Sequence, residues 1–249
     1  MDIRDEIRAW WDDDAQAYDA SPGHSMSDPV EAAAWRAALT FALPAPPARV
    51  LDVGSGTGAL AILAAGLGHE VTALDLSERM LERARSKASD LALDVTFVVG
   101  PAEEPPPGPF DAVVARHVVW TLPAPVEALR RWHEVVRPGG VLALFEGSWS
   151  GEGPLVALKD AAASILSRAI RVEAAHHGPY PAEVLDRLPL RAASSPMPFL
   201  HVVGQAGWAG IRLVRLRDVE WAADRREPWP LGWLRHRPRY AILATTPGR

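Results

Sequence analysis

The 249-residue sequence contains no cysteine. This absence excludes a disulfide framework, a thiolate nucleophile and a cysteine-based zinc site. The sequence also lacks an apolar run of about 20 residues, which a membrane-spanning helix requires. Its first residues, MDIRDEIRAWWDDD, are acidic and lack the apolar stretch of a secretory signal. We therefore expect a cytoplasmic protein with no membrane partner.

A basic excess is also absent, because the formal net charge is −5. Binding to nucleic acid requires a basic surface that neutralises phosphates, so we expect no nucleic-acid partner. The charges are unevenly placed, with nine acidic residues in 1–31 and eight arginines in 211–239. These segments either form two separate solvated faces or contact each other. Five of the arginines could alternatively bind an anionic substrate or a carrier protein: Arg225, Arg226, Arg235, Arg237 and Arg239.

From residue 49 onward, short apolar runs alternate with segments of helical spacing, which is typical of a parallel sheet covered by helices on both faces. Strands are predicted at 49–54, 69–76, 94–100, 110–116, 141–147, 211–221 and 239–246. Helices are predicted at 3–19, 29–43, 59–68, 77–89, 125–136, 154–172, 181–188 and 198–207, with Ser77 as an N-cap. The sequence thus predicts a single α/β domain.

The run LDVGSGTGAL places three glycines between a predicted strand and a helix, where backbone N–H groups can approach a ligand. The run also fits the G-x-G-x-x-A pattern of nicotinamide enzymes, and Asp75 follows at a suitable distance. However, Asp52 precedes the first glycine by two residues. A carboxylate there would repel a pyrophosphate and attract an ammonium or a sulfonium group.

Four runs in order, VLDVGSGTG, VTALDLSERMLERAR, FDAVVARHVVWTLPAP and VVRPGGVLALFEG, resemble the class I S-adenosylmethionine-dependent methyltransferases. Within that class they are most similar to the small-molecule enzymes of the ubiquinone and menaquinone biosynthesis type. The resemblance spans about residues 10–147. It implies a Rossmann-like fold with a mostly parallel seven-stranded sheet and a helical N-terminal lid. It also implies transfer of a methyl group from S-adenosylmethionine to an O or N atom of a small molecule.

The resemblance divides the single domain by role. Residues 1–43 would form the lid, 48–147 the cofactor-binding core, 148–208 a substrate cover and 209–249 the closing strands. The cover is rich in large side chains that suit a flat or hydrophobic acceptor, although core packing accounts for at least half of them: Trp149, Tyr180, Met197, Phe199 and Trp208. A monomer or a homodimer is expected.

The resemblance assigns the cofactor-binding residues by position. The methionine end would be held by Asp52, by the loop residues Gly54, Ser55, Gly56 and Gly58, and by the backbone carbonyl of Arg116. Asp75 would accept the ribose hydroxyls, and Leu76 would lie against the adenine. The family often has an acid where Pro101 stands, so the Ala102 backbone or Glu103 is expected to bind the adenine amino group instead.

The segment AYDASPGHS contains the Tyr-Asp pair that marks the lid in the resembling enzymes. Tyr18 would donate to the cofactor carboxylate, and His24 would project toward the substrate. His117, at the end of the fourth strand, and His24 are the candidate general bases. Adjacent acids at 12–14 point in different directions on a helix, so no metal site is expected.

Two other functions stay open at this point. A nicotinamide oxidoreductase fits the glycine pattern, but the sequence has no Tyr-x-x-x-Lys and only two lysines, Lys87 and Lys159. A protein that binds S-adenosylmethionine without transferring its methyl group would contain the same cofactor motifs.

Overall fold

The computed structural model describes residues 2–20, 24, 26–147, 154–169 and 180–248. Within this part of the chain, seven strands form one sheet in the order β3-β2-β1-β4-β5-β7-β6. They are β1 (Arg49–Val53), β2 (Glu70–Asp75), β3 (Val95–Val99), β4 (Phe110–Arg116), β5 (Val136–Gly147), β6 (Ala209–Arg215) and β7 (Arg239–Thr245). The first five are parallel, and β7 runs antiparallel to both of its neighbours, β5 and β6. The predicted mostly parallel, seven-stranded Rossmann-like fold is confirmed.

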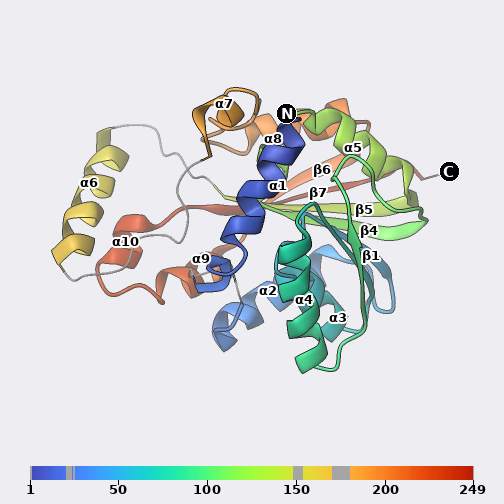
Figure 1. Cartoon of the computed structure of the whole chain (residues 1–249), viewed down its shortest axis with the longest axis horizontal. Helices are drawn as coiled ribbons and strands as arrows, with labels where there is room; N and C mark the ends of the chain where they lie inside the picture. The colour runs from blue at the N-terminus through green and yellow to red at the C-terminus, as the bar shows by residue number, and fades with distance from the viewer. Residues whose placement is uncertain (1, 21–23, 25, 148–153, 170–179, 249) are drawn as a thin grey trace.

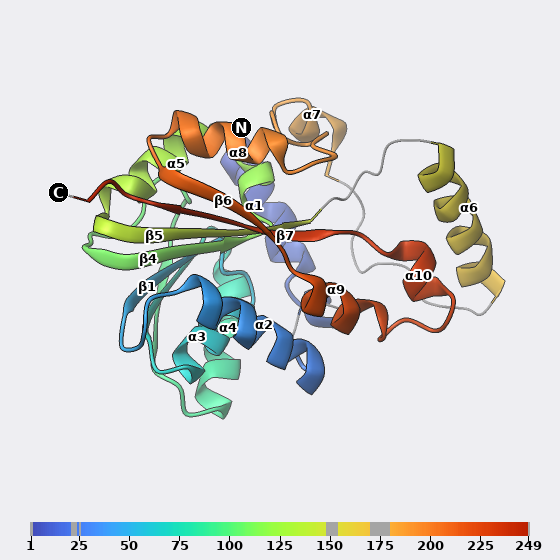
Figure 2. The ribbon, with the colours of Figure 1, turned by 180° about the vertical axis from the view of Figure 1, so that it is seen from behind.

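Helices cover both faces of the sheet (Figures 1 and 2). The described helices are α1 (Ile3–Asp14), α2 (Pro29–Ala42), α3 (Ala59–Gly66), α4 (Glu78–Asp90), α5 (Pro125–Glu134), α6 (Pro154–Ala169), α7 (Ala182–Leu185), α8 (Met197–Gln205), α9 (Arg217–Asp224) and α10 (Leu231–Arg235), with short 3-10 turns at Tyr18–Ala20 and Val119–Thr121. Ser77 caps α4 as predicted, because its hydroxyl accepts the Met80 N–H at 3.1 Å.

The central strands are buried on both faces, which explains their uninterrupted apolar sequence. Residues 112–115 of β4 are fully buried. One apolar cluster joins the sheet to α2 and α3, and a second joins its other face to α5 and α8. These two layers fix the positions of the strand ends at which the candidate site lies.

The predicted strand at 211–221 is wrong in its second half. The strand β6 ends at Arg215, and the helix α9 begins at Arg217. The strand-like run of β-branched and apolar residues is confined to IRLVRL, whereas Val219 and Ala222 are three residues apart and are both buried, as on one face of a helix. The helix α10 was not predicted, because five residues are too few to give a periodic signal.

The large side chains of the predicted substrate cover at 148–208 have different surroundings. Phe199 and Trp208 are buried in the apolar cluster beneath α5, and the Trp208 indole donates to the Leu129 carbonyl at 3.0 Å. Phe199 and Trp208 therefore pack in the core, and Met197 is exposed. Of the four large side chains that the structure describes, Tyr180 alone lies in the aromatic cluster beneath α1. Trp149 lies outside the described residues.

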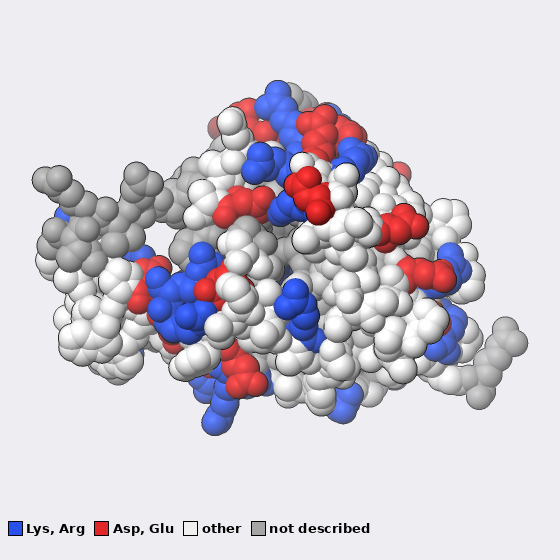
Figure 3. Space-filling view, turned by 90° about the horizontal axis from the view of Figure 1, so that it is seen from below, with Lys and Arg blue, Asp and Glu red and all other residues white. Residues whose placement is uncertain are grey.

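The acidic and basic ends of the chain meet, so the alternative of two separate solvated faces is excluded for this contact. Asp28 and Glu31, in the first turn of α2, form ion pairs with Arg225 and Arg226, which follow α9. In Figure 3, basic and acidic side chains stand beside one another at several places on this side of the molecule. Among the described helices, none is long and apolar enough to cross a bilayer.

Candidate active site

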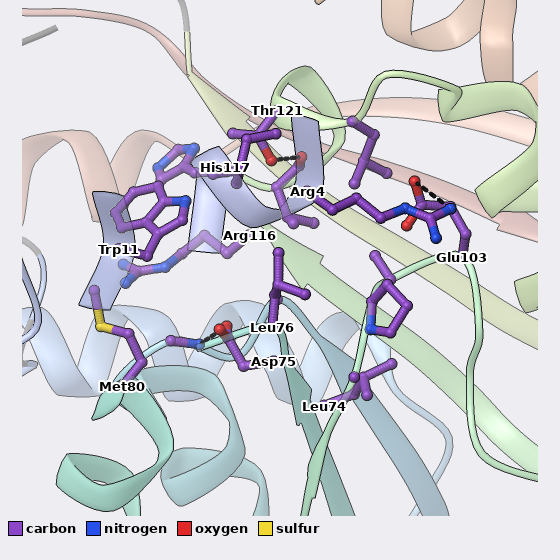
Figure 4. Close-up of a pocket in the computed structure, with 18 of the residues that line it drawn as sticks. Arg4, Trp11, Leu74, Asp75, Leu76, Met80, Glu103, Arg116, His117 and Thr121 are labelled. Carbon is purple, nitrogen blue, oxygen red and sulfur yellow. Dashed lines mark hydrogen bonds and ion pairs between the residues drawn. The ribbon is translucent and has the colours of Figure 1, made fainter. Parts of the chain in front are cut away.

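A cleft lies where the carboxyl ends of β1, β2 and β4 meet beneath α1 (Figures 1 and 4). It encloses about 750 Å³, its open mouth included. The cleft brings together nine of the predicted site residues: Tyr18, Gly54, Gly56, Asp75, Leu76, Ala102, Glu103, Arg116 and His117. Asp52 and Ser55 line a smaller pocket beside it, which shares Tyr18, Gly54, Gly56 and Arg116 with the main cleft. The carboxyl edge of a parallel sheet, at the point where strand order reverses, is the usual place for a ligand.

The three glycines of the loop between β1 and α3 share a left-handed backbone but differ in their surroundings. All three have positive φ, which favours glycine: +64° at Gly54, +55° at Gly56 and +81° at Gly58. A Cβ at Gly54 would overlap the side chain of Val118, and one at Gly58 would lie 2.8 Å from the Cβ of Ala84. Nothing lies within 4 Å of a Cβ at Gly56. Gly58 lines neither pocket and packs against Ala84 of α4.

Asp75, the last residue of β2, fixes the glycine loop and faces the cleft. One carboxylate oxygen accepts the Gly56 N–H at 2.7 Å, and the other accepts the Ser77 N–H at 2.9 Å. Burial raises the pKa of Asp75 to about 6, although both of these hydrogen bonds oppose the shift. Figure 4 shows this carboxylate beside Leu76, at the floor of the cleft.

Asp52 is the most deeply buried acid of the site, at 2% exposure. Its Oδ2 atom is buried and has no hydrogen-bond partner among the described residues. Burial raises the pKa of Asp52 to about 7, and the nearby Arg116 guanidinium opposes this shift. A buried carboxylate oxygen without a donor is a suitable partner for an ammonium group. The side chain of Arg116 lines both pockets, whereas the sequence had suggested a role only for its backbone.

His117 follows β4 directly and has a left-handed backbone, with φ of +59°. This conformation is uncommon for a residue with a side chain and is found at functional sites. The Nδ1 atom of His117 lies 3.5 Å from Oε2 of Glu146, a carboxyl group that is 3% exposed. Burial, together with Arg116, Arg239 and His24, lowers the pKa of His117 well below its ordinary value. The imidazole is therefore neutral at neutral pH.

Glu146 was missed by the sequence analysis. It is the single acid within the apolar run VLALFEG, and burial raises its pKa well above the ordinary value. An acid at the end of a fully apolar strand was the available signal. The sequence alone did not relate it to His117, because their contact depends on the pairing of β5 with β4.

His24 is not positioned as predicted. Its ring stacks on Tyr18 with centroids 4.2 Å apart, and its Nδ1 lies 3.1 Å from the Tyr18 carbonyl oxygen. The His24 carbonyl faces Arg116, whose guanidinium donates to it at 3.5 Å. His24 lines neither pocket, and its ring lies against Tyr18 instead.

The N-terminal segment covers the cleft and is attached to the core at several points. Trp10 and Trp11 pack against Tyr180, with ring centroids 4.5 Å and 6.1 Å away. Asp19 accepts the Thr57 hydroxyl at 2.7 Å and the Lys87 ammonium at 3.0 Å. Three further residues of α1 line the cleft and were not predicted to do so: Arg4, Ile7 and Trp11.

The far end of the cleft is mainly apolar and has one acid. Leu76, Met80 and Pro101 form its walls. The Ala102 carbonyl already accepts the indole N–H of Trp132 at 2.6 Å. Glu103 lines the cleft with its carboxylate 3.7 Å from Arg4 (Figure 4). Of the two predicted acceptors for an amino group at this end, the structure therefore favours Glu103.

Comparison with known proteins agrees with this geometry. Residues 51–144 match a family model described as a methyltransferase domain. The ubiquinone biosynthesis O-methyltransferase of Xanthomonas campestris pv. campestris is 36% identical over 140 residues, which are 54% of this chain and 54% of the relative. The chain thus matches about half the length of this curated relative. The family-model match includes the carboxyl ends of β1, β2 and β4, which form the cleft.

Solved structures resemble nearly the whole chain at low sequence identity. Phosphoethanolamine N-methyltransferase 2 of Haemonchus contortus, in complex with phosphomonomethylethanolamine and S-adenosylhomocysteine, has a TM-score of 0.66 at 18% identity. That match covers 99% of this chain and 60% of the other. The [4+2]-cyclase SpnF has a TM-score of 0.57 at 20% identity, over 88% of this chain and 81% of the other. At such identities the likeness establishes the fold alone.

Proposed function

Because residues 51–144 match a methyltransferase domain and the chain is similar to ubiquinone biosynthesis O-methyltransferases over about half of their length, we propose that it is a class I S-adenosylmethionine-dependent methyltransferase of that type, which transfers a methyl group from S-adenosylmethionine to a small-molecule acceptor. The observation that supports this most directly is the buried, unpartnered oxygen of Asp52 beside the cleft. That oxygen fits the ammonium group of the cofactor and would repel the pyrophosphate of a dinucleotide. The oxidoreductase alternative is correspondingly disfavoured.

In this proposal the chain's residues hold the cofactor along the cleft. Asp52 binds the ammonium group, Asp75 accepts the ribose hydroxyls, and Leu76 lies against the adenine. Glu103 accepts the adenine amino group, and Tyr18 closes the site from the lid. When bound, S-adenosylmethionine supplies an electrophilic methyl group on a sulfonium.

His117 is the proposed general base. It faces the cleft as a neutral imidazole, so it can accept a proton from an acceptor hydroxyl or amine. The Glu146 carboxyl group lies 3.5 Å from Nδ1 and gives this imidazole a polar neighbour in the interior. The remaining contribution is alignment in a site sheltered from water, worth roughly 7–11 kcal/mol in favourable cases.

We propose an oxygen atom as the acceptor in the first instance, with nitrogen as the alternative. The relatives named O-methyltransferase support oxygen. The aromatic side chains Trp11, Trp120 and Tyr180 cluster beside the cleft and support a flat, hydrophobic acceptor. A monomeric or homodimeric state and a cytoplasmic location stay predictions, as do the roles assigned to 1–43, 48–147 and 209–249.

One alternative has a specific observation in its favour. The [4+2]-cyclase SpnF has the same fold, so a chain of this kind need not be a methyltransferase. Binding of S-adenosylmethionine without methyl transfer would be detected by the mass of the product after incubation with the cofactor and acceptor.

Calorimetric titration with S-adenosylmethionine, S-adenosylhomocysteine and NAD tests the cofactor. We expect both adenosyl compounds to bind and NAD not to bind. Asp75→Ala should lower the affinity for both adenosyl ligands by about tenfold or more, since it removes a charged hydrogen-bond acceptor. The exposed Asp94→Ala is the control and should bind like the wild type. Binding of NAD alone would overturn the proposal.

A further inference from the structure

The structure separates the five C-terminal arginines into two groups. Four form ion pairs with described acids: Arg225 with Asp28, Arg226 with Glu31, Arg235 with Glu227, and Arg237 with Asp160. Arg239, the first residue of β7, is half-buried. Among the described residues, none forms an ion pair with its guanidinium.

The carboxylates whose charges act on the Arg239 guanidinium have other side-chain partners. There are three of them, and one, Glu220, also accepts the backbone N–H of Arg239 at 2.9 Å. They are Glu31, which binds Arg226 at 2.9 Å, Glu220, which binds Arg215 at 2.9 Å, and Asp224, which binds His236 at 2.6 Å. The guanidinium of Arg239 is thus left as a half-buried cation without a contact anion, an unfavourable arrangement unless a ligand supplies one.

Strand register places Arg239 at the carboxyl edge of the sheet, on the same side as His117, although Arg239 lines neither pocket. Arg239 pairs with Gly147 of β5, and Arg116 of β4 pairs with Phe145. Because residues 145 and 147 are two apart, these side chains start on one face of the sheet at its carboxyl edge. A Cβ at Gly147 would point to His117, with Cε1 at 3.6 Å. The side chain of Arg239 therefore leaves the sheet on the side of the His117 ring, with only a glycine between them.

A second cation stands on the same face. Arg116 stacks over the Trp35 ring at 5.3 Å, and Trp35 packs edge-on against Phe145. Burial and Arg116 lower the pKa of Arg239, and both arginines lower the pKa of His117. These cations repel one another, and an anion bound among them would relieve the repulsion.

We propose that Arg239, with Arg116 beside it, binds an anionic group of the acceptor, either a carboxylate or a phosphate. The acceptor is then a small acid that presents its hydroxyl or amine to His117. Its apolar part contacts the aromatic cluster of Trp11, Trp120 and Tyr180. This inference rests on the proposed function, since it names the class of acceptor for the same site. A planar guanidinium binds carboxylate and phosphate oxygens in bidentate fashion, which would orient the acceptor as well as attract it.

The test follows the Arg239 Nε–H resonance by NMR while benzoate, phenyl phosphate or neutral benzamide is added. The full chain is titrated both alone and saturated with S-adenosylhomocysteine. Anion binding at Arg239 is thereby measured separately from cofactor binding and methyl transfer. The variants are Arg239→Gln, Arg239→Lys, which keeps the charge without the planar fork, and the control Arg237→Gln, which changes a neighbouring arginine that already has a partner.

We expect benzoate or phenyl phosphate to shift the resonance saturably and benzamide to leave it unchanged. Arg239→Gln should lower the affinity for the anion by about tenfold or more. Arg239→Lys should lower it less, and Arg237→Gln should leave it unchanged. Tighter phenyl phosphate identifies a phosphorylated acceptor, and tighter benzoate a carboxylic acid. Absence of a saturable shift, or equal binding by Arg239→Gln and the wild type, would overturn the inference even if the cofactor binds as proposed.

Discussion

Burial of the charged Asp52 carboxylate destabilises the folded state when no ligand is bound. Its carboxylate lies in the interior beside the cleft, and one of its oxygens has no described hydrogen-bond partner. Burial raises its pKa from the ordinary 3.8 to about 7. The folded state therefore binds a proton at Asp52 more tightly than the unfolded state does, and stability depends on pH. The stabilising contribution is fully present below pH 3.8 and is lost as the pH rises through about 7.

This dependence of stability on pH predicts how Asp52→Asn changes the melting temperature. The variant without ligand should melt at a higher temperature than the wild type at pH 8, by several degrees, and the difference should shrink at pH 5. Its affinity for S-adenosylhomocysteine should fall in the same preparation. Thermal melts at the two pH values measure the first effect, with the exposed Asp94→Asn as control. A pH-independent difference in melting temperature would contradict the assignment of the buried charge.

At the scale of elements, the lid is held by contacts of its 3-10 turn as well as by its aromatic anchor. Asp19 reaches Thr57 at the start of α3 and Lys87 on α4. It therefore connects the covering segment to the two helices that follow the glycine loop and β2. This contact lets the cofactor-binding loop and the lid respond to each other.

Asp19→Ala should loosen the lid without unfolding the core. We expect faster proteolysis within the first 28 residues and faster release of S-adenosylhomocysteine, with a nearly unchanged melting temperature. Limited proteolysis and stopped-flow dissociation measure these effects. Asp13→Ala is the matched control, because the Asp13 side chain is 90% exposed and its contact with Arg79 is 3.9 Å long. A large loss of melting temperature would instead make Asp19 part of the core.

Elements were predictable from the sequence where their signal is local. The buried runs of β1 and β4, the glycine loop, Asp52 and Asp75 all follow from residue types within a few positions of one another. Glu146 and Arg239 did not, because their relation to His117 is set by the register between β4, β5 and β7. The boundary between β6 and α9 was not predicted, because the strand-like run joins the helical run without a glycine or proline between them.

The whole molecule is closed by a contact between its two ends. Glu31 is fully buried, and its carboxylate binds Arg226 at 2.9 Å. The pair connects α2, ahead of the first strand, to the segment that follows α9. Removing one partner leaves an uncompensated buried charge, which strongly lowers the free energy of unfolding.

Arg226→Met should lower the free energy of unfolding by about 2–4 kcal/mol, somewhat less than for a fully buried pair because the arginine side chain is 24% exposed. Urea denaturation measures the change. The double variant Glu31→Gln with Arg226→Met should lose less than the single one, since it leaves no orphaned charge. Arg212→Met, at an exposed position, is the control. An equal loss in the single and double variants would show that packing rather than charge dominates.

The contact between Gly54 and Val118 also constrains how this protein can diverge. Position 118 lines the cleft, so its side chain helps set the shape available to an acceptor. The same side chain occupies the space that any Cβ at position 54 would need. A larger side chain at position 118 would therefore clash with the glycine loop, whereas a smaller one would remove the packing contact with Gly54. A change of acceptor preference is consequently easier to reach through the lid and the C-terminal strands, because the residues that positions 54 and 118 can accept depend on each other.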